Sequence, residues 1–81
     1  MADSFGGSMI NVIKFVNKEN GRYYWLSINR DMLNGYNLTI TRGGNRNNLV
    51  VMRSFHSQEL CKQEMERLSK IRLRRGYEEV A

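Results

Sequence analysis

Few side chains in this sequence could carry out covalent chemistry. Nucleophilic catalysis needs a nucleophile, a base and a group that orients the base, yet the 81 residues contain a single histidine, His56, and a single cysteine, Cys61. Cys61 falls on the apolar side of a predicted helix and is expected to be a small core residue. His56 is expected to link a strand to that helix. We therefore predict no catalytic residues and no enzyme activity.

Metal or cofactor binding is not indicated by the sequence either. A structural zinc site needs four ligands, which one histidine and one cysteine do not supply, and neither an EF-hand loop nor a metalloprotease helix motif occurs. The carboxylates belong to a predicted turn, to the helix and to the C-terminal residues, where solvated side chains are the rule. We predict no metal, no cofactor and no small-molecule substrate.

A glycine loop flanked by arginines is the first feature with binding chemistry. Residues 42–48 read Arg-Gly-Gly-Asn-Arg-Asn-Asn, contain no apolar side chain and are predicted to form an exposed loop. The stretch is not a P-loop, because Gly43 and Gly44 are not followed by the second glycine, Lys and Ser or Thr of that motif. Its backbone amides could still approach a phosphate closely, with Arg42 and Arg46 on either side. A flexible hairpin connection with solvated arginines explains the same pattern.

The densest basic cluster lies in the last turns of the predicted helix and comprises Lys70, Arg72, Arg74 and Arg75. Cations at a helix C-terminus interact favourably with the macrodipole by about 0.3–1 kcal/mol each, so part of the cluster could be structural. Four cations in six residues exceed what capping requires. If they share a surface with the arginine loop, we expect them to add phosphate contacts whose strength depends on salt.

The charge balance of the chain favours a polyanionic partner. Thirteen Lys and Arg against eight Asp and Glu give a net charge of +5, which attracts nucleic acid, although net charge also serves solubility alone. No apolar run approaches the roughly 20 residues that cross a bilayer, and a lone cysteine is typical of the reducing cytosol. We expect a cytoplasmic protein that binds no membrane, with residues 1–9 as a flexible tail and residues 10–81 as one domain.

Four segments have the alternating or β-favouring pattern of strands, separated by turn-forming residues. They cover residues 10–16, 22–29, 36–41 and 49–55. Asn20-Gly21 is the strongest hairpin signal because both residues tolerate a positive φ, and Asn34-Gly35 marks a second turn. Consecutive strands joined by short turns predict an antiparallel meander.

One helix is predicted after the strands. Ser57 is expected to be its N-cap, and Gly76 its C′ residue in a left-handed conformation, after which Tyr77 to Val80 could return as a short edge strand. The apolar side of the helix comprises Leu60, Cys61, Met65, Leu68 and Ile71. The sequence therefore predicts an α+β fold with a single antiparallel β-sheet of four to five strands and one long α-helix packed on one face.

Aromatic side chains of the strands offer a second kind of surface. In the second strand, Tyr23 and Trp25 are expected on the face opposite Tyr24 and Leu26. They could stack on bases or sugars, or form an exposed patch with Tyr36 that docks a protein partner or a second copy of the domain. The alternative interpretation is that these aromatic side chains pack in the core.

The order of several stretches resembles the WGR domain, a module of poly(ADP-ribose) polymerases that also occurs as small bacterial proteins. Nearly the whole chain takes part. The matching stretches are Arg22-Tyr23-Tyr24, Arg30-Asp31-Met32-Leu33, Asn34-Gly35-Tyr36-Asn37-Leu38, and a helix that begins at Ser57 and ends in Arg74-Arg75-Gly76-Tyr77. The resemblance implies an antiparallel sheet with one helix packed against it. In polymerase members the Trp and Arg of the motif contact DNA ends, and the domain also contacts neighbouring domains.

The chain departs from the family at the motif that names it. Where Trp-Gly-Arg would follow the third strand, this chain has Arg42-Gly43-Gly44, so only the central glycine is kept. The DNA-end contacts of polymerase members therefore do not carry over to Arg42 or Gly44 by identity. The spacing makes Arg46 the hypothesised substitute for the missing arginine.

Together these features predict a non-catalytic module that binds nucleic acid, with DNA favoured as the partner. The predicted phosphate contacts are Arg42, Gly43, Gly44, Arg46, Lys70, Arg72, Arg74 and Arg75. The alternative is a protein-interaction or self-association module that uses Tyr23, Trp25 and Tyr36. The nucleic-acid prediction requires the arginine loop and the basic helix end to share one surface, without being neutralised by Glu78 and Glu79.

Overall fold

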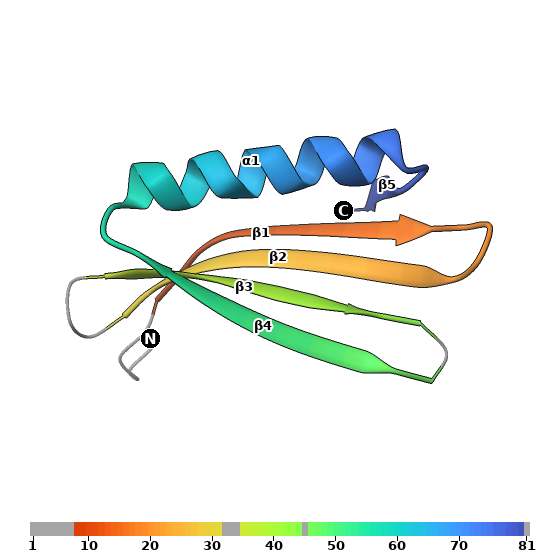
Figure 1. The fold of residues 1–81 in the computed structure, drawn as a ribbon, viewed down its shortest axis with the longest axis horizontal. Helices are drawn as coiled ribbons and strands as arrows, with labels where there is room; N and C mark the ends of the chain where they lie inside the picture. The colour runs from red at the N-terminus through yellow and green to blue at the C-terminus, as the bar shows by residue number, and fades with distance from the viewer. Residues whose placement is uncertain (1–7, 32–34, 45, 81) are drawn as a thin grey trace.

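An antiparallel sheet of five strands carries one long helix along one of its faces (Figure 1). The structure is a computed structural model that describes residues 8–31, 35–44 and 46–80. Its elements are β1 (Ser8–Asn17), β2 (Arg22–Arg30), β3 (Tyr36–Gly43), β4 (Asn48–Phe55), α1 (Gln58–Arg74) and β5 (Glu78–Val80). The strand order is β4-β3-β2-β1-β5, which confirms the predicted meander, fold class and final edge strand.

The turns of the meander form where the sequence predicts them. Gly21 has φ 75° and donates its N–H to the carbonyl of Asn17 at 2.8 Å, which closes the β1–β2 hairpin. In the next connection, Gly35 donates its N–H to Asp31 Oδ1 at 2.7 Å. The predicted turn residue Asn34 lies outside the described residues.

Two predicted boundaries are wrong. Residues 42–48 are not all loop, because Arg42 pairs with Leu49 and Gly43 with Asn48, which extends both strands. Likewise β1 begins at Ser8, which pairs with Arg30, so residues 8 and 9 belong to the sheet rather than to a tail. The error has one cause in both places: ladder hydrogen bonds use backbone groups and need no apolar side chain. Residues 1–7 lie outside the described part of the chain.

The core lies between α1 and the face of the sheet that it covers, called here the helix face. Its buried side chains are Phe15, Tyr24, Leu26, Ile28, Leu38, Ile40, Cys61, Met65 and Leu68. The predicted apolar side of α1 is confirmed at three of these positions, and Ile71 is half-buried. Leu60 is 49% exposed, because it precedes Cys61 by one residue and so is turned about 100° round the helix from it.

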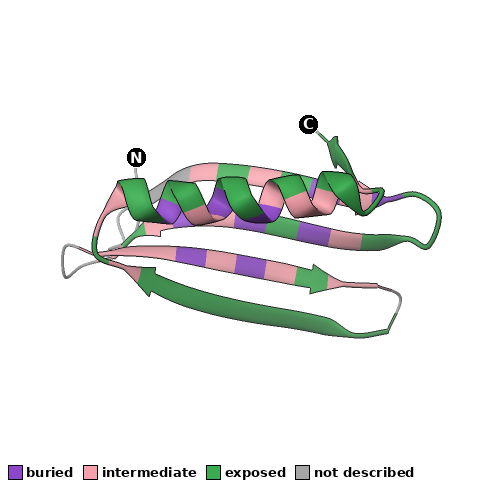
Figure 2. Ribbon diagram, turned by 45° about the horizontal axis from the view of Figure 1, so that its top comes forward, coloured by how far each residue is buried: buried purple, intermediate pink, exposed green. Residues whose placement is uncertain are grey.

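Strand β4 forms the free edge of the sheet and stays largely uncovered (Figure 2). Val51 pairs with the buried Ile40, so the predicted alternation places it on the helix face. Val50 pairs with Thr41 and lies on the opposite side, called here the open face. Every residue of the strand except Phe55 is nevertheless exposed. The helix therefore shields β4 much less than the inner strands.

Both helix caps are confirmed. Ser57 Oγ accepts the N–H of Leu60 at 3.2 Å. At the other end Gly76 has φ 90°, its N–H donates to the carbonyl of Leu73 at 3.2 Å, and the N–H of Tyr77 donates to that of Arg72 at 3.0 Å. This pair of bonds is the Schellman motif. It turns the chain sharply back toward the sheet, where β5 pairs with β1. No helix in the described ranges is long and apolar enough to cross a membrane.

Candidate nucleic-acid interface

A concave surface opens between the C-terminal end of α1 and the ends of β2 and β3, and is called here the arginine groove. Its volume is about 780 Å³. Five arginines line it: Arg22, Arg42, Arg46, Arg72 and Arg75. The remaining lining residues are Asn17, Asn20, Tyr23, Tyr24, Gly43, Gly44, Asn47, Leu49 and Tyr77. The groove is thus strongly cationic, and its other polar groups are neutral.

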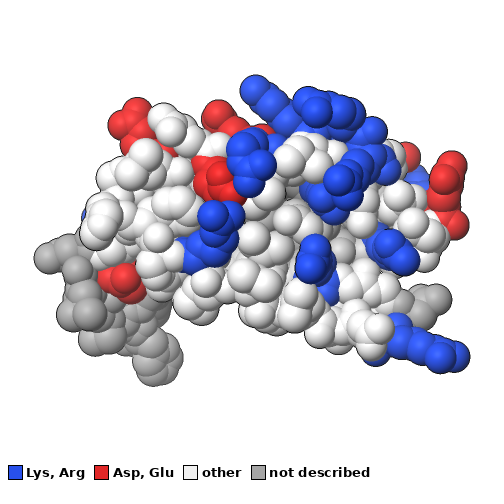
Figure 3. Space-filling view, in the orientation of Figure 1, with Lys and Arg blue, Asp and Glu red and all other residues white. Residues whose placement is uncertain are grey.

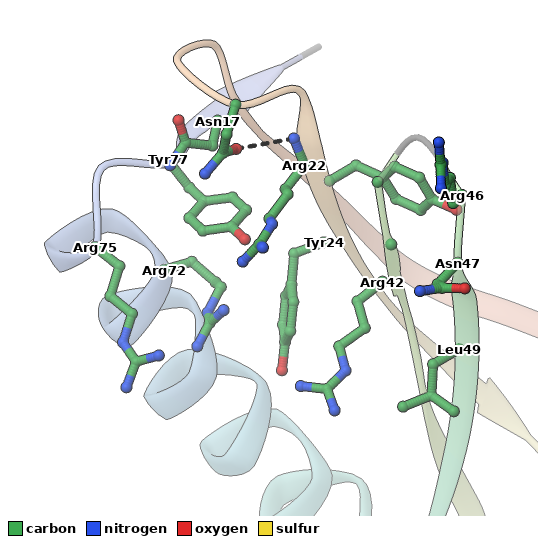
Figure 4. Close-up of a pocket in the computed structure, with 14 residues that line it drawn as sticks. Asn17, Arg22, Tyr24, Arg42, Arg46, Asn47, Leu49, Arg72, Arg75 and Tyr77 are labelled. Carbon is green, nitrogen blue, oxygen red and sulfur yellow. Dashed lines mark hydrogen bonds between the residues drawn. The ribbon is translucent and has the colours of Figure 1, made fainter.

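Strand register brings the first two arginines together around Tyr24. Tyr24 pairs with Arg42 across β2 and β3, so the two side chains stand side by side on the helix face. Arg22 precedes Tyr24 by two residues and points to the same face. Figure 4 shows the guanidinium groups of Arg22, Arg42 and Arg72 directed toward the space around Tyr24, with Arg46 at the far rim.

Arg72 reaches the groove from the helix and lies over two tyrosine rings. Its guanidinium carbon is 4.2 Å from the ring centre of Tyr24 and 5.3 Å from that of Tyr77. The two rings meet edge to face, with centres 6.3 Å apart. Its Nε is buried and donates no hydrogen bond to any of the described residues. Arg72 is therefore held in place by its contacts with the two rings.

The two glycines have different surroundings. A Cβ on Gly43 would collide with the carbonyl oxygen of Asn47 and lie 2.7 Å from Asn48 Oδ1, so this position excludes any side chain. A Cβ on Gly44 would make only an ordinary contact with Arg22. The N–H of Gly44 already donates to the carbonyl of Asn47 at 3.1 Å. The prediction that this amide is available to a phosphate is therefore wrong, because the hairpin itself uses it.

No carboxylate neutralises the groove within the part of the chain that the structure describes. None of its lining residues is Asp or Glu. Glu78 Oε1 lies 3.4 Å from Lys18 Nζ, and among the described residues no ion pair joins Glu78 to a groove arginine. Glu64 pairs with Arg53 at 2.7 Å and Arg67 at 2.6 Å, and hydrogen bonds from Arg67, together with both arginine charges, lower the pKa of its carboxyl. The ion pairs among the described residues thus leave the five groove arginines uncompensated.

The basic helix end does not act as one cluster. Arg72 and Arg75 line the groove, whereas Lys70 and Arg74 line a separate shallow hollow with Glu66. Successive residues of a helix are about 100° apart, so Arg74 points to nearly the opposite side of the helix from Arg72, about 160° away. The structure therefore places the loop residues on one surface with Arg72 and Arg75, and Lys70 and Arg74 on another. Figure 3 shows Lys and Arg side chains gathered over the C-terminal half of α1.

The three predicted aromatic residues do not form one patch. Trp25, 42% exposed, lies on the open face with its ring centre 5.2 Å from that of Tyr23 and with Lys14 Nζ 4.9 Å above it. The hydroxyl of Tyr23 hydrogen-bonds with Asn48 Oδ1. Tyr36 instead packs against the core on the helix face, because it shares the alternation of the buried Leu38. Tyr36 therefore contributes to core packing and is not part of an exposed aromatic patch.

For several residues that line the groove, the sequence did not predict a role in binding. Arg22 carries a signal that could have found it, since it shares the alternation of Tyr24 at the start of the same strand. Tyr77 directly follows the helix-ending Gly76, which predicts a sharp return of the chain. The three asparagines that line the groove, Asn17, Asn20 and Asn47, lie in or beside turns and carry no pattern that distinguishes them from ordinary turn residues.

Other chemistry is sparse in the structure. Cys61 is fully buried, and this burial raises the pKa of its thiol. His56 is exposed between β4 and α1, as predicted. Within the described ranges no group of three or more His, Cys, Asp or Glu side chains could hold a metal ion.

Comparison of the chain with family models, with curated proteins and with solved structures finds no match. The resemblance to the WGR domain accordingly stays a prediction from the sequence.

Proposed function

We propose that the protein is a non-catalytic nucleic-acid-binding module whose arginine groove contacts phosphates. The single observation that carries the proposal is that five arginines and no carboxylate line one concave surface. Guanidinium groups donate pairs of hydrogen bonds to phosphate oxygens in a geometry that a lysine does not reproduce. Five of them, spread over a groove of about 780 Å³, suit a chain of phosphates better than a single small anion.

The neutral side chains of the groove fit the same partner. Asparagine amides and tyrosine hydroxyls donate hydrogen bonds to phosphate and sugar oxygens. Such contacts position a nucleic acid without reading its sequence, so we propose binding without strong sequence preference. The sequence resemblance to WGR domains supports DNA as the first partner to test, since polymerase members of that family contact DNA ends.

The salt dependence of binding tests the proposal directly. A labelled short DNA duplex is titrated with the protein, and fluorescence anisotropy gives the affinity at several salt concentrations. If about four phosphates are neutralised, log affinity is expected to fall with log salt at a slope of about −3 to −4. An affinity that does not change with salt would reject phosphate binding.

A matched pair of variants separates the groove from net charge. Arg42→Gln and Arg74→Gln each remove one positive charge from an exposed side chain, but only Arg42 lines the groove. Arg42→Gln is expected to weaken binding and to make the salt slope shallower by about 0.9. Arg74→Gln is expected to leave the slope close to that of the parent protein. Equal losses in the two variants would mean that overall charge, and not the groove, drives binding.

A further inference from the structure

The edge strand β4 exposes apolar side chains on both faces of the sheet. Leu49, Val50, Val51 and Met52 are consecutive and are 46%, 60%, 37% and 61% exposed. Consecutive residues of a strand point to opposite faces, so a ligand docked on one face would cover only half of them. An added strand lies beside both faces at once and also pairs with the free backbone groups of the edge.

This edge lacks the usual protection against strand pairing. Natural edge strands are blunted by proline, bulges, charged side chains or short length. The sequence has no proline, and β4 pairs with β3 over eight positions without a register shift. The only charged residue of β4, Arg53, is ion-paired with Glu64 at 2.7 Å. The other edge is formed by β5, which has three residues including Glu78 and Glu79, and by residues 8–13 of β1, which β5 does not cover.

We propose that β4 pairs antiparallel with β4 of a second copy of this chain, about a twofold axis through Val51. The two five-stranded sheets then become one continuous sheet. A twofold axis perpendicular to the sheet leaves the side chains of both copies on the faces that they already occupy. Two residues that oppose one another across the seam must therefore point to the same face of the sheet. Placing the axis at Val51 satisfies this condition and pairs seven of the eight residues. The opposed residues are Val51 with Val51, Val50 with Met52, Leu49 with Arg53, and Asn48 with Ser54.

The register brings apolar side chains together and separates charges. Val51 meets its own copy on the helix face, and Val50 meets Met52 on the open face. The two copies of Arg53 are four residues apart along the strands, about 13 Å, which exceeds the screening length of about 8 Å at physiological salt. Head-to-tail pairing of β4 with β5 is disfavoured, because three residues with two carboxylates cannot match an eight-residue strand.

The dimer would place both helices and both arginine grooves on the same face of the joined sheet. Leu49, the residue of β4 that lines the groove, would lie about 13 Å along the seam from its copy in the second chain. Because the seam of two eight-residue strands is small beside standard interfaces of about 1,600 Å², we expect an association that dilution reverses. The inference does not depend on nucleic-acid binding, and its tests contain no nucleic acid.

Cysteine crosslinking tests the register. Val51→Cys places two thiols on the twofold axis, where opposed Cα atoms are about 4.5–5.5 Å apart, within the range that a disulfide spans. Val50→Cys is the matched control, because its two copies would be about 8 Å apart, beyond disulfide reach. We expect a covalent dimer from Val51→Cys under mild oxidation, and none from Val50→Cys or from the parent chain with its buried Cys61. Crosslinking of both variants alike, or of neither, overturns the proposal.

Sedimentation equilibrium over a dilution series tests association itself. Met52→Lys puts a charge opposite Val50 of the second copy and is expected to weaken association at least about tenfold, a change of about 1.4 kcal/mol. Leu73→Lys adds the same charge at a helix residue of similar exposure, 53% against 61%, and is expected to leave association unchanged. Circular dichroism checks that both variants fold. A parent chain that stays monomeric at about 1 mM, or equal weakening by both variants, overturns the proposal.

Discussion

Replacing Arg72 by methionine separates the two roles that this arginine can have in the fold and in binding. Its guanidinium lies 4.2 and 5.3 Å from the ring centres of Tyr24 and Tyr77. Two such contacts stabilise the fold by about 0.5–1 kcal/mol each at a partly exposed site. Against this, a buried donor such as its Nε that makes no hydrogen bond costs about 1–3 kcal/mol.

The two contributions nearly cancel, so the free energy of unfolding is expected to change little in Arg72→Met. Methionine keeps a long flexible stem and makes its own favourable contacts with aromatic rings, about 0.3–1.5 kcal/mol each. We expect the unfolding free energy to stay within about 1 kcal/mol of the parent value. Urea denaturation followed by the fluorescence of Trp25 measures it.

Binding is expected to respond much more strongly than stability. A hydrogen bond to a charged partner is worth about 1.5–3 kcal/mol, which corresponds to roughly a 10- to 100-fold loss of affinity for a DNA duplex. Arg72→Lys is the control, because it keeps the charge and loses the planar fork that pairs with phosphate and stacks on rings. Its affinity should lie between those of the parent and of Arg72→Met.

Two results would refute this reasoning. A loss of more than about 2 kcal/mol of stability with unchanged affinity would make Arg72 a structural residue that no phosphate contacts. Equal affinities of the parent protein, Arg72→Met and Arg72→Lys would exclude it from the interface altogether.

Three further predictions concern the fold. Ser57→Ala removes the hydroxyl that caps α1 and should lower the unfolding free energy in urea by about 1 kcal/mol; an unchanged midpoint contradicts the cap's contribution. Cys61 is buried with a raised pKa, so a thiol-specific dye should label it only as fast as the chain unfolds, and rapid labelling of the native protein would contradict its burial. Hydrogen bonds from Arg67, together with the charges of both arginine partners, lower the pKa of Glu64 from its ordinary 4.5. Its carboxylate therefore stabilises the fold above that pH and loses this contribution as pH falls through the lowered pKa. Glu64→Gln should flatten the acid limb of the stability profile, and an unaltered limb would argue against this ion pair.

Local sequence signals account for most of the fold. The asparagine-glycine pair at 20–21 closes a hairpin, and Ser57 and Gly76 bound the helix as predicted. These features depend on residues close together in the chain, whose backbone preferences act before any tertiary contact forms. The missed boundaries at residues 8 and 42 have the opposite origin. They depend on backbone pairing with a neighbouring strand, which side-chain pattern alone does not report.

The candidate site could be predicted only in part. Both loop arginines and all four helix cations were named, because charge clusters are visible in the sequence, but only two of the four helix cations, Arg72 and Arg75, line the groove. The separation of Arg72 and Arg75 from Lys70 and Arg74 follows from helical periodicity. Which of the two pairs faces the sheet depends on how α1 rotates to bury Met65 and Leu68, and this rotation is settled by packing.

By itself, the sequence determined the type and order of the elements, the buried side of β2 and β3, and both ends of the helix. Only the tertiary structure decided that Arg22, Arg42 and Arg72 surround one buried tyrosine, and that β4 remains an open edge. The physical reason is distance along the chain. Arg22 and Arg72 are 50 residues apart in the sequence. Strand register and helix packing bring them together, because both act through contacts across the core.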